Sequence, residues 1–409
     1  MYSCENFFAR VPESERAYAF WLVSVPWIGN GPIPRLLEYY GSPKDIYKAS
    51  DEDIEKIPGR KVNTGPLLKY RKEHDIFRKY DEFQRSGMKL SFVFDEDYPL
   101  RLKNIPDPPY GLFYMGDLPE NNKLSVAVIG ARQCSEYGRY IACNLGKALG
   151  SNDINLISGM AVGIDGISQG SAIASGGRSF AVLGSGADIC YPESNKGLYE
   201  DLKKAGGIIS SYPPGTKAIS CFFPPRNRIV SGLSDAVVVI EARTRSGTLI
   251  TVDMALEQGR DIYAVPGRLG DELSAGCNGL IGHGARIYLD PEIFMQDLTE
   301  DHMDVFEYGN ETDCFRSGKI IPLYDSERDK RHRNYCTEKK HFPKLDQSHL
   351  EIYSRLSFTP KTPEEIHIEI LNEGKDSPGE TGICLILMEL CLQEHAFQVS
   401  PGYYIKKSS

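Results

Sequence analysis

Patterns that would indicate metal or redox chemistry are missing from this chain of 409 residues. Its ten cysteines include no CxxC pair, and its eight histidines show no ligand spacing. These absences argue against a zinc ribbon, a thioredoxin-like redox site and a metalloenzyme. We therefore expect neither a metal nor a cofactor, and we expect the cysteines to act as small buried hydrophobic residues.

Long hydrophobic runs are missing too. No apolar stretch approaches the ~18 residues of a transmembrane helix, and the first residues, MYSCENFFARVPESER, lack the apolar core of a signal peptide. We expect a cytoplasmic protein that makes no membrane contact. Because 41% of the residues are hydrophobic and 25% are charged, wholesale disorder is excluded, and the length predicts two to four folded domains.

Positive charge is scarce except in the middle of the chain. The sequence holds 47 Lys+Arg and 56 Asp+Glu, so its net charge is 47 − 56 = −9. The same count by region gives −2 for residues 1–121, +1 for 122–290, −3 for 291–344 and −5 for 345–409. We therefore expect a polyanion site, if there is one, in the middle region, and the C-terminal region is a poor candidate.

Turns and changes of periodicity divide the chain into four parts. The first is predicted to be helical, and its PWIGNG segment resembles the turn of a helix-hairpin-helix; a tight helix–helix joint is the alternative. Residues 66–86 read as one charged helix. The third part reads as a charged linker with little core, and the fourth as three helices and a terminal hairpin, which indicates a winged helix. The four parts are residues 1–75, 76–295, 296–344 and 345–409.

From residue 123 onward, short β-branched runs alternate with helical stretches. Near-continuous apolar strands separated by helices are typical of a parallel sheet that is covered on both faces. We therefore predict an α/β protein with a Rossmann-like, mostly parallel sheet, whose motif-bearing part spans residues 122–291. The expected strands are residues 125–130, 154–159, 178–184, 206–210, 235–241, 260–267 and 285–290.

Turns rich in glycine and hydroxyl groups follow several of these strands. Ligands of open α/β sheets bind beyond the carboxyl ends of the strands, where glycine lets backbone N–H groups approach an anion and a helix N-terminus adds positive dipole. These turns predict a phosphate-binding crevice in which Arg132 makes a bidentate contact; tight packing is the alternative role of the glycines, and helix capping that of Asp165. The candidates are Gly130, Arg132, Ser158, Gly159, Gly163, Gly184, Ser185, Gly186, Arg245, Ser246, Gly247 and Thr248.

Residues 222–231, FFPPRNRIVS, place two aromatic residues before two arginines. Aromatic faces stack on unpaired bases while arginines hold the backbone, so this stretch favours a single-stranded nucleic acid. In the alternative, both phenylalanines are core residues and the arginines pair with carboxylates. The candidates are Phe223, Arg226, Asn227 and Arg228, with Lys217 close in sequence and Arg243 among the cations that would complete the groove.

Enzymatic chemistry finds little support. The first turn reads GARQCSEYG and not GxGxxG, and no GxxxxGK[ST] is present, so neither a dinucleotide site nor a P-loop is indicated. His283 is the only histidine of the core, and no carboxylate pair stands out for acid–base catalysis.

Four segments of the core, VIGARQCSEYGR, LISGMAVGIDGISQG, FFPPRNRIVSG and GCNGLIGHGA, resemble the DprA/Smf family of DNA-processing proteins. The resemblance covers residues 122–291 in order; the N-terminal helices resemble the sterile-alpha-motif-like domain found ahead of that core, and the tail resembles the winged helix that often follows it. The positions that match the family's motifs are Gly130 and Arg132; Ser158, Gly159 and Gly163; Gly184 and Gly186; Phe223, Arg226, Asn227 and Arg228; and Ser246, Gly247 and Thr248.

The resemblance implies a protein without an enzymatic reaction. Family members bind single-stranded DNA during natural transformation, protect the incoming strand, help to load RecA onto it in an interplay with single-strand-binding protein, and dimerise through the Rossmann-like core. This chain departs from the pattern at Ala131, where the family more often has Ser, and in its apolar, acidic last helix, because a winged helix that reads DNA has a basic one. That helix indicates a protein-contact or packing module.

Two other functions stay open. A nucleotide phosphoribohydrolase of related fold shows PGGxGTxxE, but Thr251 stands where its Glu should be. A nucleotide-binding sensor would use the same crevice for a small ligand.

Overall fold

The computed structural model describes residues 5–25, 31–55, 64–302, 347–356, 361–374, 377–393, 395–400 and 403–406. The PWIGNG turn and residues 303–344 of the expected linker lie largely or wholly outside them. Among the described residues, no helix is both long and apolar enough to cross a membrane.

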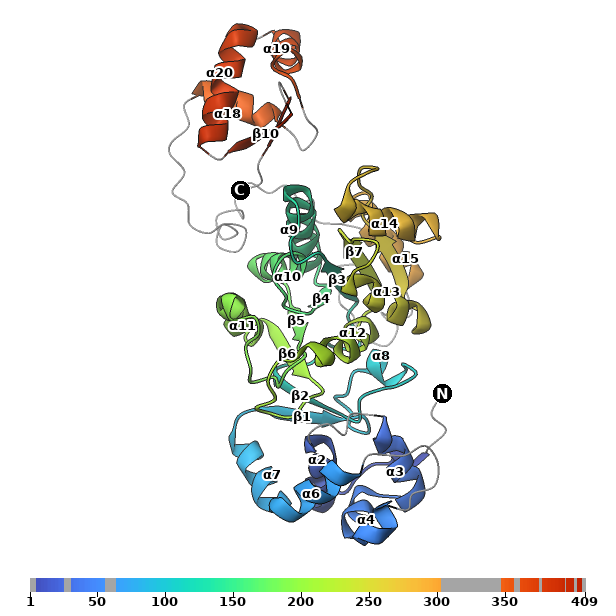
Figure 1. Cartoon of the computed structure of the whole chain (residues 1–409). Helices are drawn as coiled ribbons and strands as arrows, with labels where there is room; N and C mark the ends of the chain where they lie inside the picture. Colours follow the sequence, from blue (N-terminus) through green and yellow to red (C-terminus); the bar gives the residue numbers. More distant parts are fainter. Residues whose placement is uncertain are drawn as a thin grey trace.

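The centre of the molecule is a sheet of nine strands in the order β1-β2-β6-β5-β4-β3-β7-β8-β9 (Figure 1). The seven strands from β3 to β9 are mutually parallel, while β1 and β2 add an antiparallel edge beside β6. The predicted α/β, Rossmann-like, mostly parallel core is confirmed. The strands are β1 Lys89–Phe92, β2 Gly111–Gly116, β3 Ser125–Gly130, β4 Asn155–Ser158, β5 Ser179–Val182, β6 Gly206–Ser210, β7 Ala236–Ile240, β8 Asp261–Ala264 and β9 Arg286–Ile287.

Alternation along the central strands fills both faces of the sheet. On β3, Val126 and Val128 join one core cluster, whereas Ala127 and Ile129 join the other. The first cluster is covered by α9, α10 and α15, and the second by α11, α12 and α13. The bounds of the core helices are α8 Leu100–Lys103, α9 Glu136–Ser151, α10 Ile164–Ala174, α11 Lys196–Leu202, α12 Phe223–Gly232, α13 Gly247–Glu257, α14 Glu272–Gly282 and α15 Pro291–Asp301.

The chain reverses its direction of travel across the sheet at β3. From β3 it proceeds through β4 and β5 to β6, and then returns to place β7 on the other side of β3, where Gly130 pairs with Ile240. In sheets of this kind, the loops that follow the two strands on either side of such a reversal diverge and leave a crevice. The strand order therefore puts the crevice beside the carboxyl ends of β3 and β7.

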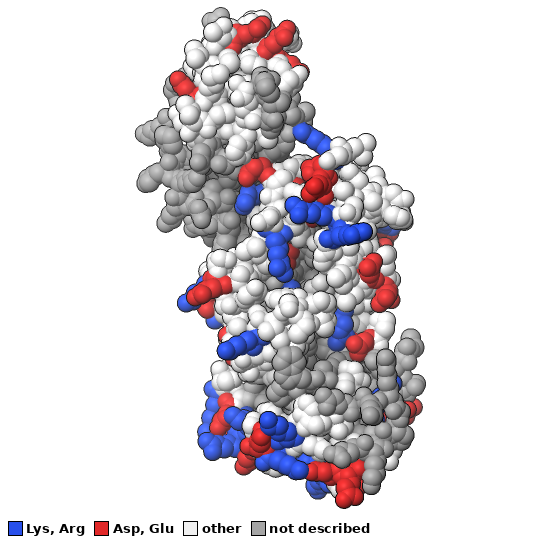
Figure 2. All heavy atoms as spheres, viewed as in Figure 1, with Lys and Arg blue, Asp and Glu red and all other residues white. Residues whose placement is uncertain are grey.

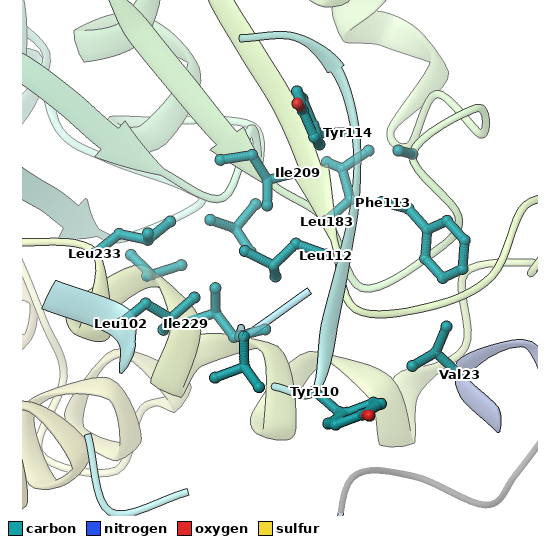
Figure 3. Packing of buried hydrophobic residues seen from close by; sticks show 14 of the residues in the cluster. Val23, Leu102, Tyr110, Leu112, Phe113, Tyr114, Leu183, Ile209, Ile229 and Leu233 are labelled. Atoms are coloured by element: carbon teal, nitrogen blue, oxygen red, sulfur yellow. The ribbon is translucent and has the colours of Figure 1, made fainter. Parts of the chain in front are cut away.

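The N-terminal helices share a hydrophobic core with the sheet. Phe20 of α2 packs against Phe83 of α7 at a ring-centroid distance of 5.1 Å, and both belong to the cluster that contains Leu112 of β2 and Ile209 of β6. Figure 3 shows this region, with Leu102 and Ile229 beside Leu112. The helices are α1 Glu5–Phe8, α2 Arg16–Ser24, α3 Pro32–Tyr40, α4 Pro43–Lys48, α5 Asp51–Glu55, α6 Gly65–Glu73 and α7 Ile76–Arg85.

The single charged helix expected over residues 66–86 is wrong: the chain forms α6 and α7 there. Asp75 starts the second helix because its carboxylate accepts the N–H groups of Phe77 and Arg78 at 3.0 and 3.2 Å. At the other end of the core, α15 continues to Asp301 with Leu298 buried, so the first residues of the expected linker are helical. The boundaries of the four parts stay a prediction.

The C-terminal part has a hydrophobic core of its own. Three helices, α18 Gln347–Arg355, α19 Pro363–Asn372 and α20 Gly379–Leu392, pack beside an antiparallel pair, β10 Ala396–Ser400 and β11 Tyr403–Lys406. This is the element order expected of a winged helix. The third helix carries no Lys or Arg and exposes Leu385, Met388 and Leu392.

Candidate nucleic-acid interface

The loops after β3, β4 and β5 meet the start of α12 around one pocket. Its lining comes from segments far apart in the sequence, which the parallel strands deliver to the same edge. Four of its residues were candidates from the sequence, and the others are apolar neighbours and a tyrosine. The lining residues are Arg132, Gly159, Ala161, Val162, Tyr191, Pro192, Phe223 and Arg226.

Phe223 lies beside two arginines in this pocket. The guanidinium carbon of Arg132 is 5.8 Å from the centroid of its ring, and that of Arg226 is 5.7 Å away. Both distances are within the range in which a cation is attracted to an aromatic face. Phe223 is only half-buried, and it begins α12 because Pro224 and Pro225 fit the first turn of a helix.

Arg132 is exposed, and its loop is fixed by backbone contacts. The N–H of Ile164 donates to the carbonyl oxygen of Ala131 at 3.2 Å. Gly163, with φ +82°, brings its Cα so close to the carbonyl oxygens of Ala131 and Arg132 that a Cβ would overlap both. The glycine thus allows the loop to hold Arg132 at the mouth of the pocket with its guanidinium available.

Arg226 has a different environment, at the floor of the pocket. It is 6% exposed, donates to the carbonyl oxygens of Gly159 at 3.2 Å and of Val182, and its Nε–H donates to Asn227. Burial lowers the pKa of Arg226 to about 10, while the nearby Asp165 carboxylate raises it. Arg226 therefore keeps its charge at neutral pH and ties β4 and β5 to α12.

Asp165 completes this floor. Its carboxylate accepts the Gly159 N–H at 3.1 Å, and burial raises its pKa although Arg226 and hydrogen bonds lower it. The helix-capping alternative stated for Asp165 does not describe this arrangement, in which the carboxylate holds the start of the connection between β4 and α10 and interacts electrostatically with Arg226 of α12.

Several other sequence candidates have their polar groups engaged inside the protein. The hydroxyl of Ser158 donates to the carbonyl oxygen of Val128 at 2.6 Å, that of Ser185 is within hydrogen-bond distance of the Ile189 carbonyl at 3.2 Å, and the N–H of Gly186 donates to Thr216 at 2.8 Å. Gly184 is buried beside the Phe223 ring. These residues shape the loops, and for Gly184 and Gly186 this is the packing alternative stated above for the glycines.

Two members of the FFPPRNR stretch lie away from the pocket. Phe222 stacks on Tyr212, with ring centroids 4.4 Å apart and an interplanar angle of 27°. Arg228 forms an ion pair with Asp107 at 3.2 Å. Asn227 and Arg228 are partly buried, so the exposed cation of this pocket is Arg132.

The start of α13 forms the second half of the crevice. Its N-cap residue, Ser246, makes no side-chain capping hydrogen bond, and its buried Oγ has no hydrogen-bond partner among the described residues. The hydroxyl of Thr248 donates to the Gly130 carbonyl at 3.3 Å, and Gly247 is exposed. No side-chain cap closes this helix end among the described residues, so its first N–H groups can serve a ligand.

Exposed cations surround these two halves. Lys217 and Arg245 are exposed, and Arg243 makes a long ion pair of 3.7 Å with the exposed Glu272. Figure 2 shows several basic side chains over the middle of the molecule, with acidic side chains among them. Exposed pairs of this kind are weak, so these cations remain available to a polyanion.

Tyr191 is the residue that the sequence interpretation missed. It lies in the loop after β5, is 47% exposed, and its ring centroid is 5.7 Å from that of Phe223. An aromatic residue inside a loop rich in Gly and Asp is the signal that the sequence offers. Thr251, which replaces the glutamate of the hydrolase motif, is buried in α13.

Comparison with known proteins gives consistent matches. A family model described as DNA recombination-mediator protein A matches residues 89–299. The DNA processing protein DprA of Streptococcus pneumoniae is 39% identical over 211 residues, which are 52% of this chain and 72% of that protein. Protein Smf of Synechocystis sp. is 33% identical over 302 residues, 70% of this chain and 73% of the relative.

A solved structure gives the same result. The X-ray structure of DprA from Streptococcus pneumoniae superposes with a TM-score of 0.61 at 33% sequence identity, covering 70% of this chain and 98% of that one.

Proposed function

We propose that this chain, which belongs to the family of DNA recombination-mediator protein A, binds single-stranded DNA in the crevice around Arg132. The observation that carries the proposal is the grouping of an exposed arginine with two accessible aromatic rings, Phe223 and Tyr191, in one pocket. The guanidinium fits a backbone phosphate and the rings fit unpaired bases.

The charge distribution supports a strand that crosses from the pocket to the start of α13. Arg132, Lys217, Arg243 and Arg245 are exposed on this face, and the open N-terminus of α13 adds backbone donors and positive dipole. A strand binder needs only such a local groove, so the net charge of −9 does not oppose binding.

Fluorescence anisotropy with a labelled poly-dT oligonucleotide tests the proposal. We expect preferential binding to the single strand over a duplex of the same length, because only unpaired bases offer their faces. The logarithm of the association constant should fall with the logarithm of salt concentration by about 0.7 per phosphate contacted. Equal affinity for the duplex, or a curve that is flat with salt, would contradict the proposal, and titration with small nucleotides would then test the sensor alternative.

Replacing Tyr191 by alanine should weaken binding of poly-dT about 5- to 150-fold, because stacking contributes about 1–3 kcal/mol per base. Tyr191→Phe keeps the ring and should bind like the wild type. Tyr39 is similarly exposed but lies on α3, so Tyr39→Ala is the matched control. A Tyr191→Ala protein with wild-type affinity would remove this residue from the site.

The finer role is also a proposal. We infer that the bound strand is incoming DNA of natural transformation, which the protein protects and onto which it helps to load RecA in the presence of single-strand-binding protein. The description of the family as recombination mediators supports this role. Strand exchange by RecA on DNA coated with single-strand-binding protein should accelerate when this protein is added; no acceleration would contradict it.

A homodimer through the core belongs to the same proposal. Ile287 of the edge strand β9 and the following Leu289 are 47% and 66% exposed, which supports an apolar contact at that edge. Sedimentation of the wild type and of Leu289→Glu tests it: a monomeric wild type would reject the dimer.

A further inference from the structure

The N-terminus of α9, the first helix after the central strand β3, holds a carboxylate of the protein itself. The helix begins after Ser135, whose hydroxyl oxygen accepts the Gly138 N–H at 3.1 Å. The carboxylate of Glu241, the residue directly after β7, accepts the Ser135 N–H at 2.8 Å and also the Ser135 hydroxyl. Glu241 is only 3% exposed.

Both the backbone and the neighbouring residue accommodate this carboxylate at a cost. Glu241 has φ +57°, in the left-handed region, where a residue other than glycine is strained. Gly138 lies against the carboxylate so closely that a Cβ would overlap it. A strained residue that persists beside a fitted glycine indicates a role that outweighs the strain.

The place of Glu241 at the N-terminus of α9 indicates what this role is. In Rossmann-like sheets, the N-terminus of the helix after the first central strand is where the phosphate of a nucleotide binds, because its free N–H groups and dipole favour an anion. Here β3 and β7 flank the reversal of strand order, and Glu241 brings its negative charge to that helix end from β7.

We infer that Glu241 is an internal anion that occupies the phosphate position of α9 and makes the crevice reject free nucleotides and small phosphates there. The inference rests on the proposed function, in which the crevice binds a DNA strand at Arg132 and at the start of α13. That second helix end has no such carboxylate among the described residues, and its Ser246 hydroxyl is unpartnered. Glu241 thus determines specificity without touching DNA.

The test is binding of inorganic pyrophosphate to the full chain, followed by calorimetry and by the amide resonances of Ser135 and Gly138. Glu241→Gly removes the carboxylate and suits φ +57°, so this variant should fold. Glu241→Gln removes the charge but keeps the position filled. Glu272→Gln is the matched control, because Glu272 is an exposed carboxylate near the same sheet edge, beside Arg243.

In the wild type, we expect pyrophosphate to leave both amide resonances unshifted. Glu241→Gly should bind it at least about tenfold more tightly than the wild type, because the vacated Ser135 N–H and hydroxyl form charge-assisted hydrogen bonds. Both amides should shift, since the Gly138 N–H is bonded to that same hydroxyl oxygen. Glu241→Gln should gain less, and Glu272→Gln should gain nothing at these amides.

Three results would overturn the inference: pyrophosphate shifts at Ser135 and Gly138 in the wild type, an equal gain in Glu272→Gln, or a gain in Glu241→Gln as large as in Glu241→Gly. The wild-type titration decides even when a variant fails to fold. Affinity of Glu241→Gly for poly-dT should stay within about twofold of the wild type. If the wild type does not bind poly-dT, the proposed function is rejected, but the pyrophosphate result can still be interpreted.

Discussion

Replacing Arg132 by alanine is expected to lower the affinity for poly-dT about 10- to 100-fold without changing the stability of the fold. Arg132 is exposed, and its loop is held through backbone atoms, by Gly163 and the Ile164 N–H. The loop therefore does not depend on the Arg132 side chain. A hydrogen bond to a charged group contributes about 1.5–3 kcal/mol, and each 1.4 kcal/mol is a tenfold change in affinity.

The salt dependence separates loss of a phosphate contact from a general disturbance. In Arg132→Ala, the slope of log affinity against log salt should decrease by about 0.7, which corresponds to one phosphate of a single strand. Arg132→Lys keeps the charge but loses the planar fork, so its affinity should lie between the two. Arg10→Ala is the control, because Arg10 is an exposed arginine in the connection that follows α1.

An affinity of Arg132→Ala within about twofold of the wild type would contradict the placement of the strand in this pocket. An unchanged slope with reduced affinity would mean that Arg132 acts through Phe223, over whose ring it lies, and not on a phosphate.

The parallel strands were predictable because each lies in a short run rich in apolar residues between turn residues. All seven predicted runs contain a strand of the sheet. The edge strands β1 and β2 were not predicted. Lys89–Phe92 is short and mixed in polarity, and β2 is separated from it by a long connection that contains α8. Antiparallel pairing across such a connection is a tertiary outcome that the local pattern does not specify.

The site was predictable as a set of loops but not as a set of side-chain directions. Arg226 and Arg228 look equivalent in the sequence. On a helix, however, side chains two residues apart point in directions that differ by about 200°. Because α12 begins at Phe223, Arg226 turns to the buried ends of β4 and β5 while Arg228 turns to Asp107. The start of that helix decides both roles; the two prolines favour a first turn there, but they do not tell which face of the helix meets the sheet. The role of Glu241 could not be predicted either, because its partner Ser135 is distant in the sequence.

Replacing the second pocket arginine, Arg226, should lower the stability of the fold, whereas replacing Arg132 should lower only the affinity for DNA. Removing one partner of a buried charge pair costs about 3–5 kcal/mol, because the other charge stays buried without compensation. In Arg226→Ala, the Asp165 carboxylate would lose its neighbouring cation, and the carbonyl oxygens of Gly159 and Val182 would lose their donor.

Urea unfolding, with hydrogen exchange of the β4 and β5 amides, measures this effect. We expect a lower unfolding midpoint for Arg226→Ala and faster exchange in both strands, whereas Arg132→Ala should match the wild type in both measurements. Arg243→Ala is the control for loss of an arginine from an exposed pair, which should cost less than about 1 kcal/mol. A stable Arg226→Ala protein that has lost only DNA affinity would mean that Arg226 contacts the strand directly. The two arginines beside one phenylalanine would then share one role, instead of dividing the pocket into a binding cation and a structural one.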